Sequence, residues 1–344
     1  MLGEDELAKI VLGMATSHGP LLSTPPENWG ERVKADRVNK QLWFRGSIHP
    51  FDDLEQMRTT EGLDHKASLA ERQSRSARCR QALDTLADTF EQVNPDVVVI
   101  VGNDQHEVFS ERNMPAFSVY YGDTVTNRPP TDRQISLMPP GTAMAMHGHR
   151  PPKELQYPCE PALATYIIAE MMQKEFDVAQ TNDLPQDGTE WSRDGLPHAF
   201  GFVLRQVMRD RPVPHVPIMV NSFYPPNQPT ARRCYRFGRA LAEAIESWPS
   251  DKRVAVIASG GLSHFVVDEE LDGIFLDALR SGDPEGMTRL PEAHLQSGTS
   301  ELKNWIPVGA AMHAAGLAMD LVDYVPCYRS LAGTGNAMGF VRWS

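Results

Sequence analysis

Three short runs of apolar, mostly β-branched residues are the clearest feature of this chain, and each predicts a strand that is buried on both faces of a sheet. The first run begins at Ile10, the second covers residues 97–101 and the third covers residues 254–258. Small or polar residues follow each run, so the chain can turn sharply where each strand ends. We expect the third run to be a central strand.

A histidine follows each of these runs. His18 comes after the first, His106 after the second and His264 after the third. In open α/β sheets, ligands bind beyond the carboxyl ends of the strands, so histidines at these positions are well placed for chemistry. A single histidine there is equally consistent with a structural role at a helix cap or a backbone carbonyl. Three strand ends of the same kind favour one shared site.

The remaining periodic segments predict helices and further strands. Apolar residues recur at i, i+3, i+4 and i+7 in the segments expected to be helices, which are 76–93, 160–174, 231–248, 269–279 and a segment that starts near 301. Short apolar runs predict additional strands at 115–121, 176–179, 216–221 and 337–343. This pattern predicts an α/β fold with a central mixed, largely parallel sheet flanked by helices. Without a repeat or linker, we expect a single catalytic domain over residues 1–344.

Two long stretches, at about 21–75 and 122–155, have no clean period. Connections of this length are uncommon unless they are functional, so we expect both to be insertions over a site, or the first to be an oligomer contact. The i, i+2 pair of His147 and His149 in the second stretch is expected to lie in a solvated loop. The apolar content of the first stretch favours a homo-oligomer, most simply a dimer.

Composition narrows the class of protein. The chain has 344 residues, of which 41% are hydrophobic and 23% charged, as in ordinary globular proteins. A net charge of −12 argues against nonspecific binding to nucleic acid or anionic membranes. The amino terminus lacks a signal-peptide pattern and no apolar run approaches the roughly 20 residues of a membrane span, so we expect a cytoplasmic protein. The four cysteines are far apart, which suggests neither a zinc-thiolate site nor a disulfide framework.

The candidate chemistry is that of a metal held by histidines and a carboxylate. This donor set, with open coordination positions and no thiolates, is typical of a mononuclear non-haem iron(II) centre, and zinc would also accept it. A dioxygenase of this type needs further histidines that move protons. Glu301 is a candidate carboxylate, but its position in a first helical turn is equally consistent with charge–dipole capping. Spacing alone does not decide among these possibilities.

Several motifs resemble those of the class III extradiol ring-cleavage dioxygenases, the family of the protocatechuate 4,5-dioxygenase β subunit, gallate dioxygenase and 3-O-methylgallate dioxygenase. The resemblance covers most of the chain, and its motifs lie at 15–18, 101–104, 221–226 with 232–234, 258–264 and 297–305. Gly-Gly-Leu-Ser-His followed by Ser-Gly-x-x-Glu is the most specific part. The resemblance implies Fe(II)-dependent extradiol cleavage, with O2, of a catechol-type aromatic acid from lignin degradation that is similar to gallate, protocatechuate or 3-O-methylgallate.

The resemblance also implies roles for individual residues. His18 is similar to the first iron ligand and Glu301 to the carboxylate ligand. His264 and His198 are similar to the two histidines that act as catalytic acids or bases beside the substrate.

The second histidine ligand is the one departure from the family pattern. The family's strand ends Asn-Asp-His, whereas this chain reads Asn-Asp-Gln-His, so an ungapped match places Gln105 at the ligand position. His106 can serve only if the strand end bulges by one residue, since a one-residue slip turns a side chain to the other face. We expect His106 to be the ligand, with His49 or His65 as possible substitutes from the first insertion.

Substrate contacts and competing functions complete the expectations. Tyr224, Arg329 and Arg342 are candidates for binding a substrate carboxylate because they lie near the matching motifs. The expected partners are therefore a small aromatic diol and O2. Two alternatives stay open: a metal-dependent hydrolase or lyase on the same fold that uses zinc-bound water, and a metal-free homologue that acts as a binding scaffold.

Overall fold

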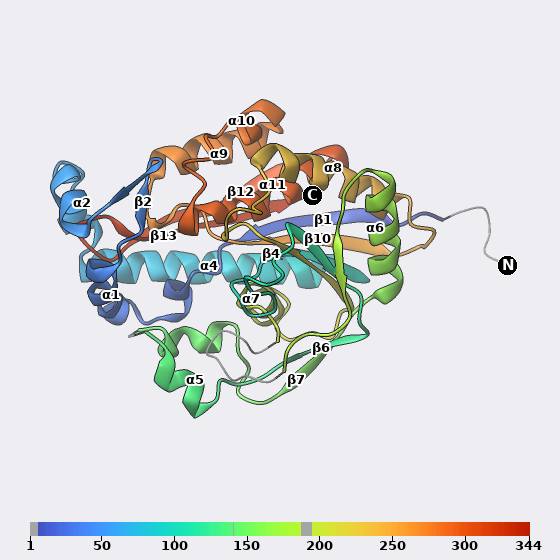
Figure 1. Cartoon of the computed structure of the whole chain (residues 1–344), viewed down its shortest axis with the longest axis horizontal. Helices are drawn as coiled ribbons and strands as arrows, with labels where there is room; N and C mark the ends of the chain where they lie inside the picture. The colour runs from blue at the N-terminus through green and yellow to red at the C-terminus, as the bar shows by residue number, and fades with distance from the viewer. Residues whose placement is uncertain (1–5, 140, 187–194) are drawn as a thin grey trace.

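The computed structural model of the chain describes residues 6–139, 141–186 and 195–344. A nine-stranded sheet crosses the molecule, and helices cover both of its faces (Figure 1). The strand order is β11-β13-β1-β10-β4-β9-β5-β8, and β12 pairs with β13. The four neighbouring strands β1 (Lys9–Thr16), β10 (Arg253–Ser259), β4 (Val97–Asn103) and β9 (His215–Val220) are mutually parallel.

Antiparallel strands flank this parallel centre. On one side, β13 (Thr334–Trp343) pairs with β1, β12 (Met319–Tyr328) and the short β11 (His264–Val266). On the other side, β5 (Phe117–Tyr120) runs antiparallel to β9 and parallel to β8 (Ala179–Thr181). The predicted α/β class with a mixed sheet is confirmed, and the third apolar run is a central strand.

The alternation of side chains along the strands explains the two helical layers. Val98 and Ile100 of β4 pack in one apolar cluster with α4 (Leu69–Val93), whereas Val99 packs in another with α8 (Ala231–Glu246) and α11 (Leu302–Ala314). All three side chains are fully buried. A strand covered on both faces must be apolar at every position, which is why the run predicted it.

Close backbone contact joins two of the covering helices. A Cβ atom at Gly238 of α8 would lie only 2.0 Å from the carbonyl oxygen of Pro307 in α11, so glycine is required at this crossing. Helix α4 begins earlier than its apolar pattern predicts, because Ser68 caps it by accepting a hydrogen bond from the backbone N–H of Glu71.

None of the other described helices and turns is longer than α11, and most are shorter. The α-helices are α1 (Val33–Val38), α2 (Phe51–Met57), α3 (Leu63–Lys66), α5 (Asp132–Leu137), α6 (Pro161–Gln173), α7 (His198–Phe202), α9 (Glu269–Ser281) and α10 (Pro284–Thr288). The 3-10 and π turns are η1 (Pro20–Ser23), η2 (Pro26–Arg32), η3 (Ala143–Gly148), η4 (Val203–Val207) and η5 (Ser297–Glu301). Two antiparallel strand pairs form separate small sheets: the hairpin of β2 (Leu42–Phe44) with β3 (Ser47–His49), and β6 (Thr124–Asn127) with β7 (Leu155–Pro158).

Both insertions are therefore built from short helices, turns and strands, although neither sequence shows a sustained periodic pattern of apolar residues. The strand predicted at 176–179 is misplaced, since β8 starts at Ala179. Phe176 instead packs edge-on against Phe117 and Phe237, with ring centroids 6.2 and 5.5 Å away, and belongs to the core. The last strand, β13, starts three residues before the predicted residue 337.

The described part of the chain contains no helix with the length and apolar character needed to cross a membrane. The first five residues, on which the expectation of a missing signal peptide partly rests, lie outside the described residues.

Candidate metal centre

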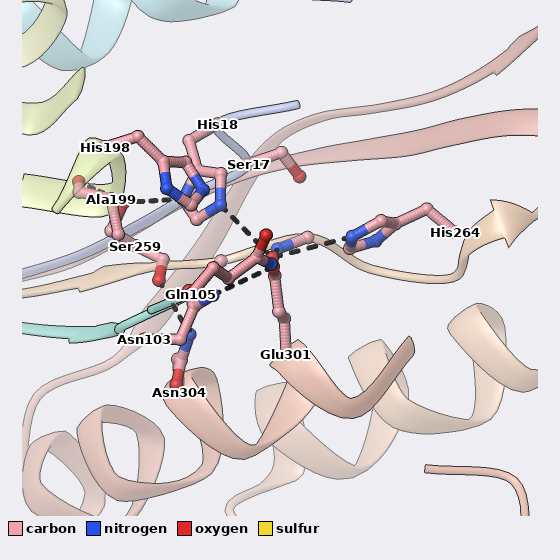
Figure 2. Close-up of polar contacts among 12 residues, drawn as sticks. Ser17, His18, Asn103, Gln105, His198, Ala199, Ser259, His264, Glu301 and Asn304 are labelled. Atoms are coloured by element: carbon pink, nitrogen blue, oxygen red, sulfur yellow. Dashed lines mark hydrogen bonds and ion pairs between the residues drawn. The ribbon is translucent and has the colours of Figure 1, made fainter. Parts of the chain in front are cut away.

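The carboxyl ends of β1, β10 and β4 meet at one edge of the sheet, because these three strands are parallel neighbours. His18 follows β1, the Gly260-Gly261 pair follows β10, and Glu301 comes from the turn η5 in front of α11. Figure 2 shows the rings of His18 and His198 on one side of the Glu301 carboxylate and His264 on the other. The strand ends thus share one polar cluster, as predicted for His18 and His264.

Glu301 is the centre of this cluster. Its side chain is 1% exposed, and its Oε2 atom lies 3.3 Å from Nε2 of His18 and 3.7 Å from Nε2 of His264. Burial alone favours the neutral carboxyl group, but the two histidines outweigh it and hold the pKa of Glu301 well below its ordinary value. Glu301 stands at the N-cap of α11, but within the described residues its side chain makes no capping hydrogen bond to that helix and faces the two histidines instead.

Three amide groups orient the Glu301 carboxylate. The backbone N–H of Gly261 donates to Oε2 at 2.6 Å, while the side-chain amides of Asn103 and Gln105 donate to Oε1 at 3.2 and 3.1 Å. These donors stabilise the charged form and fix the direction in which Oε2 points. Oε2 is left facing the imidazole nitrogens.

A serine determines the tautomer of His18. The hydroxyl group of Ser259 donates to the carbonyl oxygen of Ala199 at 2.7 Å, so its oxygen accepts the Nδ1–H of His18 at 2.9 Å. Burial lowers the pKa of His18 despite the nearby Glu301, which favours the neutral ring. Nε2 of His18 therefore presents a lone pair toward Glu301, as a metal ligand requires.

His198 is oriented in a similar way by a carboxylate. Its Nδ1 atom lies 2.5 Å from Oε1 of Glu107, which also accepts the backbone N–H of His198 at 3.0 Å. The other oxygen of Glu107 accepts the backbone N–H of Gln105 at 2.7 Å. Burial opposes the charged ring, but Glu107 outweighs it and raises the pKa of His198 to about 9. His198 begins α7, and its Nε2 atom is not engaged in the contact with Glu107.

These residues form a set of donors that suits a metal ion. Among the described residues, His18, His198 and Glu301 each offer one ligand atom, and the three atoms lie within 4.8 Å of one another. Two imidazole nitrogens and a carboxylate oxygen suit iron(II) and also zinc. A histidine ligand whose other nitrogen is hydrogen-bonded to a carboxylate is common in metal sites, and His198 with Glu107 has that arrangement. The residues present therefore fit a metal ion.

The structure places His106 outside this cluster, so the expected one-residue bulge does not bring it in. Asp104 accepts the backbone N–H groups of residues 107, 108 and 109 at 3.0, 2.8 and 3.1 Å, which closes a tight turn after β4. Gln105 then points to Glu301, whereas His106 has a φ of +64° and turns away. The His106 ring stacks on Tyr224 with 3.7 Å between centroids, and its Nδ1 atom bonds the carbonyl of Phe109.

The two substitute ligands from the first insertion also lie outside the cluster. His49 belongs to the hairpin of β2 and β3 and contacts Phe44, with 6.5 Å between ring centroids. His65 is exposed on α3. Among the described residues, neither borders the cavity that contains His18 and Glu301.

A cavity of about 230 Å³ opens beside the cluster. His18, His198, His264 and Glu301 border it, together with residues of both insertions, which include Ser23, Arg32, Met146, His149 and Arg150. Residues from both insertions therefore help to enclose the site.

His149 departs from the expected solvated loop. It borders the cavity, and its ring lies 5.9 Å from that of His198. Burial and the nearby Arg150 hold the pKa of His149 well below its ordinary value, so it adds a neutral imidazole to the wall. His147 is exposed, as expected.

His264 borders the same cavity. Its Nδ1–H donates to the carbonyl oxygen of Leu262 at 2.8 Å, which directs Nε2 toward Glu301. Burial opposes the charged ring, but Glu301 outweighs it and raises the pKa of His264. Its position at the wall, with one nitrogen anchored, suits a group that exchanges a proton with a bound molecule.

The three predicted substrate-binding residues do not border the cavity within the described part of the chain. Arg329 is 2% exposed, and its Nε and Nη2 atoms donate to Asp36 at 2.7 and 2.8 Å, so it is a structural cation. Arg342 pairs with Asp320 at 2.9 Å on the sheet surface, and Tyr224 stacks on His106.

A comparison with models of protein families shows to which family the chain belongs. The model described as the catalytic LigB subunit of aromatic ring-opening dioxygenase matches residues 62–337. The chain belongs to the LigB family. Its resemblance to the extradiol dioxygenases, predicted from five groups of motifs, is thereby confirmed.

Two relatives of this LigB-family chain are named dioxygenases. The gallate dioxygenase of Pseudomonas putida is 37% identical over 139 residues, which are 38% of this chain and 37% of the relative. The 2,3-dihydroxyphenylpropionate/2,3-dihydroxicinnamic acid 1,2-dioxygenase of Mycolicibacterium smegmatis is 28% identical over 192 residues, 54% of this chain and 49% of the relative. The chain matches less than half the length of either relative.

Sequence reasoning missed several groups around the cluster. Glu107 directly follows the predicted His106, so the run of polar residues after β4 contained a signal for it. Ser259 ends the predicted central strand, where a hydroxyl group could have been considered as a partner for a histidine. Arg32 and His149 had no comparable local signal, because only the folded insertions bring them to the cavity.

Proposed function

We propose that this protein is an Fe(II)-dependent extradiol dioxygenase that opens the ring of a catechol-type aromatic acid. The observation that carries the proposal is the cluster of His18, His198 and Glu301 at the cavity wall. Membership of the LigB family supports a ring-opening reaction. The named relatives support a substrate similar to gallate or another dihydroxylated aromatic acid, such as one from lignin breakdown.

We assign His18, His198 and Glu301 as the metal ligands. The role of His198 thus differs from the acid–base role that the resemblance implies, since Glu107 holds it as a ligand histidine is held. Gln105 occupies the position expected for a histidine and acts by holding Glu301. When bound to these donors, Fe(II) would supply electrons for O2 and open positions for the two hydroxyl groups of a substrate.

The protein's own residues prepare the site for that chemistry. His264 is the acid–base group, since its anchored Nδ1–H leaves Nε2 to take a proton from a substrate hydroxyl group. His149 lines the wall as a neutral imidazole and can donate or accept a hydrogen bond. Met146, Phe202 and Phe265 give the cavity an apolar wall for an aromatic ring. Its volume of about 230 Å³ suits one ring, since pockets for drug-sized ligands measure about 300–1,000 Å³.

The first experiment is anaerobic loading with Fe(II), metal quantification, and O2 uptake with catechol, gallate, protocatechuate and 3-O-methylgallate. Wild-type protein is compared with His198→Ala, His106→Ala and Gln105→Ala. We expect one iron per chain and O2 uptake in wild type and in His106→Ala, because His106 lies outside the cluster. His198→Ala should lose iron.

Several outcomes would contradict the proposal. If His198→Ala binds a full equivalent of iron while Gln105→Ala loses its iron, the ligand is Gln105 and not His198. Tightly held zinc without O2 uptake would favour a hydrolase or lyase, which the same donors permit. No bound metal and no uptake with any substrate would favour a binding scaffold. The cytoplasmic location and the homodimer expected from the sequence stay predictions.

A further inference from the structure

Arg32 is a cavity residue without an acidic partner. It ends η2 in the first insertion and borders the cavity that contains His18 and Glu301. Its Nη1 atom donates to the hydroxyl oxygen of Thr142, from the second insertion, at 3.0 Å. Its Nε atom is buried with no hydrogen-bond partner, and no carboxylate of the described residues forms an ion pair with it. Arg32 as a whole is half-buried, and leaving the buried Nε–H of a cation without an acceptor is costly unless a ligand supplies one.

The nearest acidic group is already engaged. Asp36 lies close enough to favour the charged form of Arg32, but its two oxygens accept Nε and Nη2 of Arg329 and the hydroxyl group of Thr334 at 2.7–2.8 Å. Arg329 in turn repels Arg32. Two arginines therefore share one carboxylate, which leaves a net positive charge beside the cavity.

The other charged groups of the cavity do not offset this charge. The carboxylates of Glu301 and Glu107 face His18 and His198, respectively. Arg150, which also borders the cavity, is 4% exposed and donates to Asn127 and to a backbone carbonyl. The cavity therefore combines the candidate metal ligands His18, His198 and Glu301 with an apolar wall and the Arg32 guanidinium group, which matches the parts of an aromatic acid.

We propose that Arg32 binds the carboxylate of the aromatic substrate, so that the site selects aromatic acids over neutral aromatic diols. This inference rests on the proposed function for the identity of the ring and names the residue that recognises its acidic group. A guanidinium group pairs with a carboxylate through parallel N–H donors, and such charge-assisted hydrogen bonds are strong where water is excluded. Thr142 holds the guanidinium group in place from the second insertion.

The test measures binding, which separates it from the test of catalysis. Isothermal titration calorimetry under anaerobic conditions gives Kd values for gallate and for methyl gallate, which has the same ring without the carboxylate charge. In wild type we expect tighter binding of gallate. In Arg32→Gln, the Kd for gallate should rise about 10- to 100-fold while that for methyl gallate changes less than about 3-fold.

Two further variants control the result. Arg32→Lys keeps the charge but not the planar fork, and should retain part of the preference for gallate. Lys34→Gln removes a positive charge from an exposed position on α1 and should leave both Kd values unchanged. Methyl gallate binding reports that each variant is folded.

Three results would overturn the inference: a wild type without preference for gallate, an Arg32→Gln variant with unchanged gallate binding, or equal weakening of both ligands. A failed proposal of catalysis looks different. In that case no O2 is consumed with any substrate, yet the Arg32-dependent preference for gallate would still be measurable.

Discussion

Nε2 of His18 lies 3.3 Å from Oε2 of Glu301, and the opposite nitrogen of the same ring is held by Ser259 at 2.9 Å. The serine hydroxyl group donates to Ala199, so it can only accept from the ring. This relationship fixes which nitrogen carries the proton and which carries the lone pair. If His18 binds a metal as proposed, its ability to do so depends on Ser259, which is not itself one of the proposed ligands.

Ser259→Ala should weaken metal binding. Without the hydroxyl oxygen, the Nδ1–H of His18 loses its acceptor and the ring loses its fixed orientation, so we expect metal affinity to fall about 10- to 100-fold. Competition with a chelator of known affinity measures this change. Ser118→Ala is the matched control, because Ser118 is equally buried in the same sheet but its hydroxyl group has no hydrogen-bond partner in the part of the chain that the structure describes. Equal metal affinities in Ser259→Ala and wild type would contradict the tautomer argument.

Glu107→Gln should also reduce metal affinity by about 10- to 100-fold. Both oxygens of Glu107 accept hydrogen bonds, from Nδ1 and the backbone N–H of His198 and from the backbone N–H of Gln105. Glutamine has one acceptor oxygen, so its NH2 group would face a donor. The same competition assay measures the effect. Glu243→Gln, which removes a surface pair with Lys174, is the control and should retain wild-type affinity.

Asp36→Asn tests the role of Arg329. The change leaves a buried guanidinium group without its carboxylate, so the free energy of unfolding should fall by about 3–5 kcal/mol. Urea denaturation measures this loss. Asp52→Asn removes a pair with exposed Arg37 and should cost less than about 1 kcal/mol. Unchanged stability combined with a higher KM for aromatic acids would return Arg329 to the list of substrate contacts.

His215 should make stability depend on pH. Its ring is fully buried, its Nδ1–H donates to the carbonyl of Pro158, and its Nε2 atom has no hydrogen-bond partner among the described residues. Burial lowers the pKa of His215 to about 4 from 6.5. As the pH falls, the unfolded chain therefore binds a proton at His215 before the folded protein does. The contribution of neutral His215 to the free energy of unfolding is complete above pH 6.5 and is lost as pH falls toward 4. The loss amounts to about 3 kcal/mol.

The measurement compares urea unfolding of wild type and His215→Asn at several pH values. Asparagine can still donate a hydrogen bond to Pro158 but does not titrate. The free energy of unfolding of the variant should therefore lack the pH dependence that His215 contributes between pH 6.5 and 4. His65→Asn, at an exposed position on α3, is the control and should follow wild type. Identical slopes for wild type and His215→Asn would show that His215 does not titrate as argued.

The parts of the fold that the sequence predicted best are those with strong local patterns. β1, β4 and β10 were predictable because a run without charged side chains, rich in apolar residues, is stable in a sheet only between two covering layers. β8 was misplaced because Phe176 is as apolar as a strand residue, and only packing against Phe117 and Phe237 assigns it to the core. Local composition does not distinguish these two forms of burial.

At the site, too, chain order predicted some of the positions and only the tertiary structure decided the others. His18 and His264 lie directly beyond their strands, so chain order brought them to the cluster. Residues 105 and 106 differ by one position, and the choice between them depends on three backbone hydrogen bonds to Asp104. A one-residue change in a turn reverses which side chain faces the site.

The sequence by itself determined the parallel strands, the strand-end histidines and the family. Only the tertiary structure decided which charges are compensated. Arg329 pairs with Asp36, which lies 293 positions away in the chain, whereas Arg32 lies only four positions from Asp36 and has no ion pair among the described residues. Separation along the sequence therefore does not determine which arginine forms the ion pair with Asp36. The pairing depends on how the first insertion packs against the rest of the fold. This packing makes Arg329 a structural residue and leaves Arg32, which we propose binds the substrate, without an ion pair among the described residues.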